Sequence, residues 1–274
     1  MESKAGLFTL LDGTVIPEYG FGCYASSGGE IAEKVACALE CGYRYLDSAA
    51  KYENEDGVGQ GMKLSGLPRE QIYLLSKVWP TDYERAAASV EQTLRDLDTD
   101  YLDCCLLHWP GTEEARRFAA WEKLLELQQK GRIRSVGVSN FLPDQMERLK
   151  ETFGSYPVLN QVELHPLYQQ KELRQYCGQR GIAVVAYSPL KRGAMEEAPS
   201  LQAIARKYGK TVSQVILRWH LQSGHTAIPN SSRPARIREN FDIFDFALVQ
   251  EEMARIDAMD CGGNRGNDPR TYNG

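Results

Sequence analysis

The sequence predicts an α/β fold, a single (β/α)8 TIM barrel with an N-terminal β-hairpin and two additional helices. Two observations carry this prediction. Short apolar runs alternate with helical patterns about eight times, and the runs are apolar on both faces, as parallel strands covered by helices are. The length of 274 residues fits one such barrel. We therefore expect one domain over residues 1–274.

Eight apolar runs are expected to form the barrel strands. Helical spacing fills the segments between them, for example at Phe118, Trp121 and Leu124. Several of these segments end in glycine, at Gly42, Gly131 and Gly181, where a left-handed helix cap would need it. The expected strands are Tyr19–Cys23, Tyr43–Asp47, Ile72–Val78, Leu102–His108, Ile133–Ser139, Val158–Glu163, Ala183–Tyr187 and Thr226–Ile228.

Three segments lie outside the eight units. Residues 7–16 are expected to form a hairpin, in which Asp12 and Gly13 supply the two positive φ angles of a type I′ turn. The helical stretches Thr211–Ser223 and Leu248–Met259 exceed what eight units need. The tail, residues 261–274, is rich in Gly, Asn and Asp and is expected to be a loop.

Composition narrows the class of protein. The chain has 32 Lys and Arg against 37 Asp and Glu, a net charge of −5, and no basic block that would bind nucleic acid or anionic lipid. It has no apolar run of signal-peptide or membrane-spanning length, so we expect a cytoplasmic protein. Its 7 cysteines include no C-x-x-C pair, which predicts reduced, buried thiols and no metal site.

Polar side chains stand at the carboxyl end of nearly every expected strand. In (β/α)8 barrels these ends form the face where chemistry takes place. One polar loop residue needs no functional explanation, but seven strand ends in succession do. The residues are Asp47, Lys77, His108, Ser139, Asn140, Gln161, Glu163, Tyr187, Ser188, Asn230, Ser231, Ser232 and Arg233.

Four residues at these ends suit acid catalysis. Tyr52 follows Asp47 on the same loop, and a nearby ammonium group, such as that of Lys77, would lower the pKa of its phenol. Asp47 could hold Lys77 in place, and His108 could orient a carbonyl oxygen. The set offers a proton donor and stabilisation of a developing alkoxide, without an obvious nucleophile.

The motifs that carry these residues resemble those of the aldo-keto reductase family, in the family's order. The match spans the chain from Ile16 to about Leu248, and the chain is similar to small microbial members, including those that reduce diketo-sugar acids. The matching segments are Gly42–Glu55, Leu74–Trp79, Leu106–Pro110, Gly137–Phe141, Asn160–Pro166, Ala186–Leu190 and Ile228–Asn240.

The resemblance implies roles for individual residues. The family's catalytic tetrad falls on Asp47, Tyr52, Lys77 and His108, with Tyr52 as the acid. It implies reduction of a carbonyl compound with NADPH, and NADH remains possible because Asn230 stands where the family usually has lysine. The expected cofactor contacts are Ser139, Asn140, Gln161, Tyr187, Ser188, Leu190, Asn230, Ser231, Ser232, Arg233, Arg236, Glu239 and Asn240.

Three aromatic residues follow strand ends near the expected site. Tyr24, Trp79 and Trp109 either pack at the rim or form an apolar wall for the substrate, and the resemblance favours the wall. The loops after Trp109 and Leu190 are short, which predicts an open pocket. We expect a small-molecule carbonyl substrate and a monomer.

Three other interpretations fit the residues less well. The alternative on the same fold is a non-catalytic NADP(H)-binding or structural protein, against which the intact tetrad argues. A metal-assisted hydrolase is disfavoured because the strand ends offer one histidine and no carboxylate cluster. The G-x-G pattern at Gly20 and Gly22 resembles a dinucleotide fingerprint, but no helix follows it directly, so we expect these glycines to permit close backbone packing.

Overall fold

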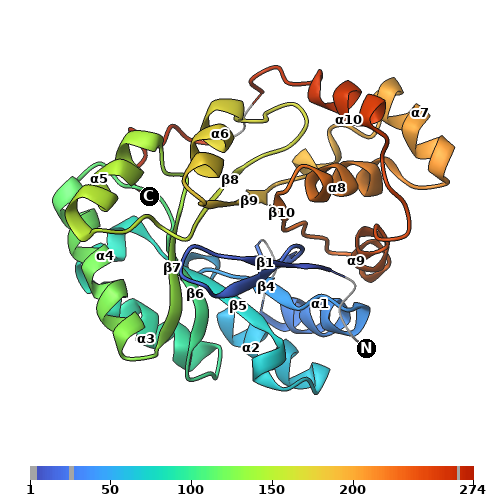
Figure 1. Cartoon of the computed structure of the whole chain (residues 1–274). Helices are drawn as coiled ribbons and strands as arrows, with labels where there is room; N and C mark the ends of the chain where they lie inside the picture. Colours follow the sequence, from blue (N-terminus) through green and yellow to red (C-terminus); the bar gives the residue numbers. More distant parts are fainter. Residues whose placement is uncertain (1–4, 25–27, 264–265) are drawn as a thin grey trace.

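The computed structural model describes residues 5–24, 28–263 and 266–274. Its centre is a sheet of eight parallel strands in sequential order, surrounded by helices (Figure 1). A parallel bridge between Tyr19 and Ala227 joins the first strand to the last and closes the barrel. The predicted barrel is confirmed. Its strands are β3 (Phe21–Gly22), β4 (Tyr45–Asp47), β5 (Tyr73–Val78), β6 (Leu102–Leu107), β7 (Ile133–Ser139), β8 (Leu159–Glu163), β9 (Ala183–Tyr187) and β10 (Thr226–Ala227).

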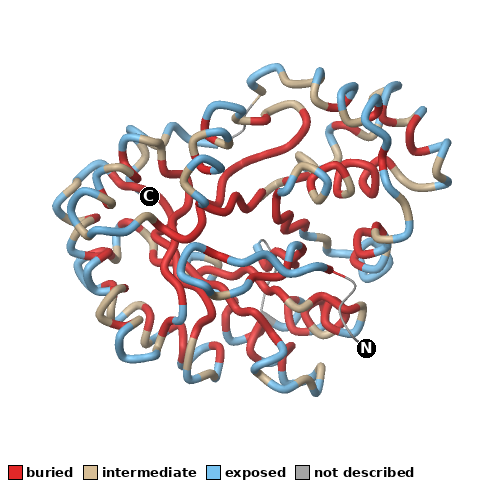
Figure 2. Tube along the Cα trace, in the orientation of Figure 1, coloured by how far each residue is buried: buried red, intermediate tan, exposed pale blue. Residues whose placement is uncertain are grey.

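Helices cover the outside of the barrel, and Figure 2 shows that each has buried residues as well as exposed ones, as expected when one face of a helix packs on the strands. The predicted glycine caps are confirmed, since Gly42, Gly131 and Gly181 all have positive φ. The helices are α1 (Gly28–Cys41), α2 (Glu55–Ser65), α3 (Ala86–Asp96), α4 (Glu114–Gln129), α5 (Pro143–Phe153), α6 (Lys171–Gln179), α7 (Pro199–Tyr208), α8 (Val212–Gln222), α9 (Pro234–Phe241) and α10 (Gln250–Asp257).

The structure has two helices beyond the eight strand-and-helix units of the barrel, as predicted. One of the two is not the helix that the sequence indicated. Of the two helices between β9 and β10, α8 packs against β10, so it serves as the crossover. In contrast, α7 packs against α8 and α10, and α7 and α10 lie side by side at the upper right of Figure 1. The additional helices are therefore α7 and α10, because the burial of α8 against a strand decides its role.

The hairpin β1 (Leu7–Thr9) and β2 (Val15–Pro17) crosses the amino-terminal end of the barrel. Its predicted type I′ turn is wrong, because Gly13 has a φ of 83° and Asp12 is not in the left-handed region. The Asp12 carboxylate instead accepts hydrogen bonds from the Thr14 backbone N–H (3.0 Å) and the Ser135 hydroxyl (2.7 Å). Leu10 belongs to the apolar cluster inside the barrel, so the hairpin plugs this end.

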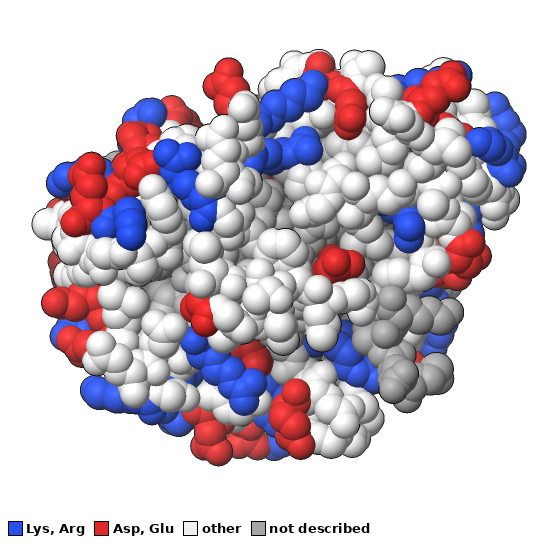
Figure 3. All heavy atoms as spheres, viewed as in Figure 1, with Lys and Arg blue, Asp and Glu red and all other residues white. Residues whose placement is uncertain are grey.

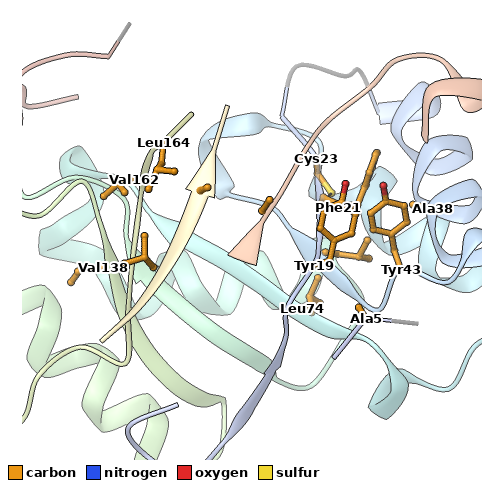
Figure 4. Packing of buried hydrophobic residues seen from close by; sticks show 14 of the residues in the cluster. Ala5, Tyr19, Phe21, Cys23, Ala38, Tyr43, Leu74, Val138, Val162 and Leu164 are labelled. Carbon is orange, nitrogen blue, oxygen red and sulfur yellow. Dashed lines mark hydrogen bonds between the residues drawn. The ribbon is translucent and has the colours of Figure 1, made fainter. Parts of the chain in front are cut away.

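A second apolar cluster fills the space between strands and helices. Figure 4 shows part of it, where Tyr19 and Phe21 of the first strand region pack toward Tyr43. The interpretation of the two glycines as packing positions is supported, because a Cβ at Gly20 would collide with the ring of Tyr45. A Cβ at Gly22 would lie 2.9 Å from the carbonyl oxygen of Ile228.

All seven cysteines are free thiols, as predicted. Their predicted burial is wrong for two of them, since Cys261 is exposed and Cys41 is partly exposed. Among the described residues, no helix is both long and apolar enough to cross a membrane. Figure 3 shows acidic and basic side chains interspersed around the periphery of the face viewed.

Candidate active site

An ion pair lies inside the barrel at the carboxyl ends of two neighbouring strands. Lys77 of β5 places its Nζ 2.6 Å from Oδ1 of Asp47 at the end of β4. The same Nζ donates to the carbonyl oxygen of Ser48 at 2.7 Å. Lys77 is 1% exposed and Asp47 is 2% exposed. Since a buried charge is tolerated only with partners of this kind, the pair holds the amine in one position.

Tyr52 lies above this ion pair. The short 3-10 helix η1 (Ala50–Tyr52) follows β4 and turns the phenol back over the strand ends. Nζ of Lys77 is 3.4 Å from the Tyr52 hydroxyl oxygen, at the long end of hydrogen-bond distance. The ring of Tyr52 meets that of His108 edge to face, with centroids 5.8 Å apart. The structure therefore brings together all four residues expected to form a tetrad.

The pKa of Tyr52 differs from the sequence-based expectation. Burial raises this pKa to about 12, and the positive charge of Lys77 opposes the rise without cancelling it. The expectation that the Tyr52 pKa is lowered overall is wrong, because the sequence indicates the neighbouring amine but not how far the fold removes the phenol from water. Burial also disfavours the charged form of Lys77, but Asp47 and Tyr52 outweigh it and raise the Lys77 pKa. Both groups are protonated at neutral pH.

His108 is held neutral. Burial lowers its pKa well below the ordinary value, and the charge of Lys77 lowers it further. The imidazole packs edge to face against Trp79, with centroids 4.8 Å apart. A neutral imidazole can donate one hydrogen bond to a carbonyl oxygen, so His108 can orient such an oxygen beside the Tyr52 hydroxyl.

The residues expected to contact a nicotinamide form one network with the ion pair. Nε2 of Gln161 donates to Oδ2 of Asp47 at 2.5 Å. The Tyr187 hydroxyl donates to Oδ1 of Asn140 at 2.9 Å, and Nδ2 of Asn140 donates to Oγ of Ser139 at 3.0 Å. Asn140 has a φ of 63°, in the left-handed region, which asparagine adopts more readily than most non-glycine residues.

A second group of expected cofactor residues lies after β10. Arg233 precedes α9 and Arg236 lies in its first turn, and both are exposed. Within the described ranges neither guanidinium has a partner, so both are available to an anion. The amide of Asn230 donates to the carbonyl oxygen of Tyr24 and so links the exits of β10 and β3.

The remaining members of this group lie around α9 and the exit of β9. The Glu239 carboxylate accepts from the Thr211 hydroxyl at 3.0 Å, and the Asn240 carbonyl oxygen accepts from the Tyr19 hydroxyl at 2.8 Å. Ser231 accepts a hydrogen bond from the Arg233 backbone N–H at 3.2 Å. The last three expected cofactor residues lie in the loops that follow β9 and β10, and their side chains make no contact that identifies a ligand. They are Ser188, Leu190 and Ser232.

The tail crosses the mouth of the barrel. The backbone N–H of Gly266 donates to Oε2 of the buried Glu163 at 2.8 Å, and Arg270 pairs with Asp144 at 3.1 Å. A cavity of about 70 Å³ lies between this segment and the ends of β7, β8 and β9. The expectation of an open pocket is wrong, because the tail covers part of what the short loops leave exposed.

The tail adds an aromatic residue to the expected substrate wall. The ring of Tyr272 packs against Trp109 at 4.7 Å and against Trp79 at 6.1 Å between centroids. On the other side of the site, Tyr24 packs edge to face on Tyr52 at 5.0 Å. Tyr24 thus contacts the phenol and Trp79 contacts the imidazole, while Trp109 joins Trp79 through Tyr272, a residue that the sequence did not indicate.

Two residues of the site escaped the sequence argument. Tyr272 lies in an aperiodic tail, and nothing local to it signals a contact with the barrel. Tyr45 donates its hydroxyl to Oδ2 of Asp47 at 2.9 Å. Tyr45 could have been found, because residues two apart on a strand point to the same side, and Tyr45 precedes Asp47 by two.

A sequence profile of the Aldo/keto reductase family matches residues 20–260. The chain belongs to this family. This confirms the resemblance drawn from the motifs, and membership makes the protein an NAD(P)H-dependent oxidoreductase. Within the described ranges, no group of three or more His, Cys, Asp or Glu side chains is placed to hold a metal ion.

Relatives of this aldo/keto reductase extend over nearly the whole chain. It is 45% identical over 263 residues to the glyoxal reductase of Bacillus subtilis, covering 95% of both chains. It is 40% identical over 267 residues to the methylglyoxal reductase DkgA of Escherichia coli, covering 97% of both. The solved structure of a Gox0644 mutant in complex with NADPH superposes with a TM-score of 0.93 at 36% identity, covering 98% of both chains.

Proposed function

We propose that this aldo/keto reductase reduces an aldehyde or ketone to an alcohol with NADPH, and that Tyr52 is the general acid. The supporting observation is the position of the Lys77 amine, which lies 2.6 Å from the Asp47 carboxylate and 3.4 Å from the Tyr52 hydroxyl. This arrangement places a protonated phenol next to a fixed positive charge. Such a pair can release a proton and then stabilise the phenolate that remains.

Each member of the tetrad has a distinct task. When bound, the reduced nicotinamide supplies a hydride to the carbonyl carbon. Tyr52 donates its phenolic proton to the carbonyl oxygen, so the product is a neutral alcohol. Lys77 stabilises the resulting phenolate, and Asp47 holds Lys77. Neutral His108 donates a hydrogen bond that orients the carbonyl oxygen toward Tyr52.

The residues present fit an NADP(H) cofactor. Tyr187 offers an aromatic face and Asn140 an amide for the nicotinamide end. At the other end, Arg233 and Arg236 offer planar guanidinium groups at the N-terminus of α9, where the helix dipole favours an anion such as a 2′-phosphate. Asn230 adds no cation there, so we propose that NADH is also accepted, with lower affinity.

The double variant Arg233→Ala/Arg236→Ala is expected to weaken NADPH binding about 100-fold or more, because each of the two charge-assisted contacts with the phosphate contributes about 1.5–3 kcal/mol. NADH lacks this phosphate, so its Kd should change less than threefold. Fluorescence titration of both cofactors measures the two constants. Equal losses for NADPH and NADH would show that these arginines do not recognise the 2′-phosphate.

An NADPH oxidation assay tests the function itself. The panel comprises aldehydes, α-keto esters, diketones and keto-sugars, and includes glyoxal and methylglyoxal because two relatives are named for them. We expect turnover of at least one class. Tight NADPH binding without turnover of any compound would favour the non-catalytic alternative. We propose also that residues 1–274 act as one domain and that the protein is cytoplasmic and monomeric. Gel filtration and light scattering can check the oligomeric state, and cell fractionation can check the compartment.

A further inference from the structure

One basic side chain at the barrel mouth has no part in the proposed mechanism. Lys51 lies on η1 immediately before Tyr52 and is exposed. Its Nζ lies over the indole of Trp79, 5.4 Å from the ring centroid. The same indole also packs against the His108 imidazole, 4.8 Å away between centroids. The amine therefore stands at the barrel mouth, on the aromatic side chain that also packs against His108.

The amine of Lys51 lies beside Trp79 and not on the acidic surface next to η1. Glu53 has a positive φ of 54°, and it lines a separate cavity of about 700 Å³ outside the barrel together with Asp56 and Asp82. Lys51 does not line that cavity. Lys51 therefore lies toward Trp79, whereas Glu53, Asp56 and Asp82 lie toward α3.

The charged groups nearest to Trp79 and His108 are already paired or neutral, while the unpaired Arg233 and Arg236 lie after β10 in the group expected to bind the cofactor. Lys77 is paired with Asp47, and His108 is uncharged at neutral pH. Arg270 on the tail is paired with Asp144. Among the described residues, Lys51 has no carboxylate partner. Its contact with Trp79 is a cation–π contact at an exposed site, which is weak, so the amine can turn toward an anion at little cost.

We propose that Lys51 is a specificity-determining residue that binds the carboxylate of an anionic carbonyl substrate. This rests on the proposed function, because the carbonyl group of the substrate must lie between Tyr52 and His108. Lys51 and His108 contact the same indole, so their separation cannot exceed the sum of the two centroid distances. A carboxylate joined to the carbonyl by a short carbon chain can span this gap. The favoured substrate class is therefore a short aldehyde or ketone acid.

The test compares succinic semialdehyde with butanal, which has the same number of carbons and no charge. Lys51→Met removes the charge and keeps the length of the side chain, and Lys51→Arg keeps the charge. Lys130→Met is the matched control, since Lys130 is exposed after α4 at the opposite end of the barrel. Steady-state kinetics and succinate binding, measured by calorimetry, are the two readouts.

We expect Lys51→Met to lower kcat/KM for succinic semialdehyde about three- to fivefold through KM, the upper end of the effect of one exposed ion pair. Butanal should change less than twofold, and Lys51→Arg should stay close to wild type. Lys130→Met should leave both substrates unchanged. Succinate should bind more weakly to Lys51→Met by a similar factor.

Two results would overturn this assignment. An equal loss for both aldehydes would show that Lys51 acts only by packing on Trp79, and unchanged values for both would show no role in recognition. Failure of the proposed function is distinguishable, because wild type would then reduce neither aldehyde. The calorimetric comparison still decides the matter in that case, since succinate binding needs the Lys51 charge but no turnover.

Discussion

Tyr52→Phe is expected to lower kcat by at least about 100-fold, the low end for loss of a general acid. Phenylalanine keeps the ring that packs against Tyr24 and His108 and removes only the hydroxyl that lies 3.4 Å from the Lys77 amine. Without the hydroxyl, the developing alkoxide has no protonated phenol beside it. The affinity for NADPH should change little, because the lost atom belongs to the proton-transfer step.

Tyr101→Phe is the matched control for this variant. It makes the same chemical change at a tyrosine just before β6, at the amino-terminal end of the barrel, whose hydroxyl has no partner among the described residues. Its kcat should equal that of wild type. Near-normal turnover by Tyr52→Phe, measured by NADPH oxidation under saturating substrate, would remove Tyr52 from the role of acid.

The raised pKa of Tyr52 sets the pH dependence of this step. With a pKa of about 12, the phenol keeps its proton at neutral and mildly alkaline pH. We therefore expect the reduction rate to show no loss through ionisation of Tyr52 up to about pH 9. An apparent pKa between about 7 and 8 in kcat that disappears in Tyr52→Phe would contradict the burial effect described above.

The sequence was sufficient to bring together three of the four candidate catalytic residues, because Asp47, Lys77 and His108 lie at or near the ends of neighbouring parallel strands, whereas Tyr52 lies on η1. Asp47 ends β4 and Lys77 lies near the end of β5, so strand order alone brings them together. His108 follows β6 for the same reason. Periodicity and the polarity of strand ends thus predicted both the barrel and the ion pair.

Features that depend on aperiodic segments or on burial were not predictable in this way. The tail reaches Trp79 and Trp109 through Tyr272, across more than half of the chain, and no repeating pattern encodes such a contact. The turn at Asp12 depends on a hydrogen bond to Ser135, far along the chain. The sign of the Tyr52 pKa shift required knowledge of how much solvent the fold removes.

Acid is expected to destabilise the fold, beginning near pH 6.5, the ordinary pKa of histidine. Burial lowers the pKa of His220 to about 3 and that of His225 to about 2, and it also lowers that of His108. These three rings are neutral in the folded chain and take up protons on unfolding. Their contribution to stability is complete above about pH 6.5 and is lost as pH falls toward the folded-state values.

The expected slope follows from the number of protons. Each proton taken up on unfolding lowers the free energy of unfolding by about 1.4 kcal/mol per pH unit. Burial of Glu55 acts in the opposite direction, because its raised pKa makes the folded chain hold a proton that the unfolded chain releases. Below about pH 6 the three imidazoles alone would give a slope of up to about 4 kcal/mol per pH unit, and the raised pKa of Glu55 reduces it.

The double variant His220→Gln/His225→Gln tests the origin of this slope. The two rings meet edge to face at 6.0 Å and also pack against Trp219, away from the catalytic residues. Glutamine cannot titrate, so the variant should take up about two fewer protons on unfolding. Its free energy of unfolding should therefore fall less steeply with falling pH, even if its stability at neutral pH is lower. Urea unfolding at several pH values between about 4.5 and 7.5 gives the slope for both proteins. An unchanged slope would mean that the acid sensitivity arises outside this pair of histidines, since only the difference in bound protons between the folded and unfolded chains can produce it.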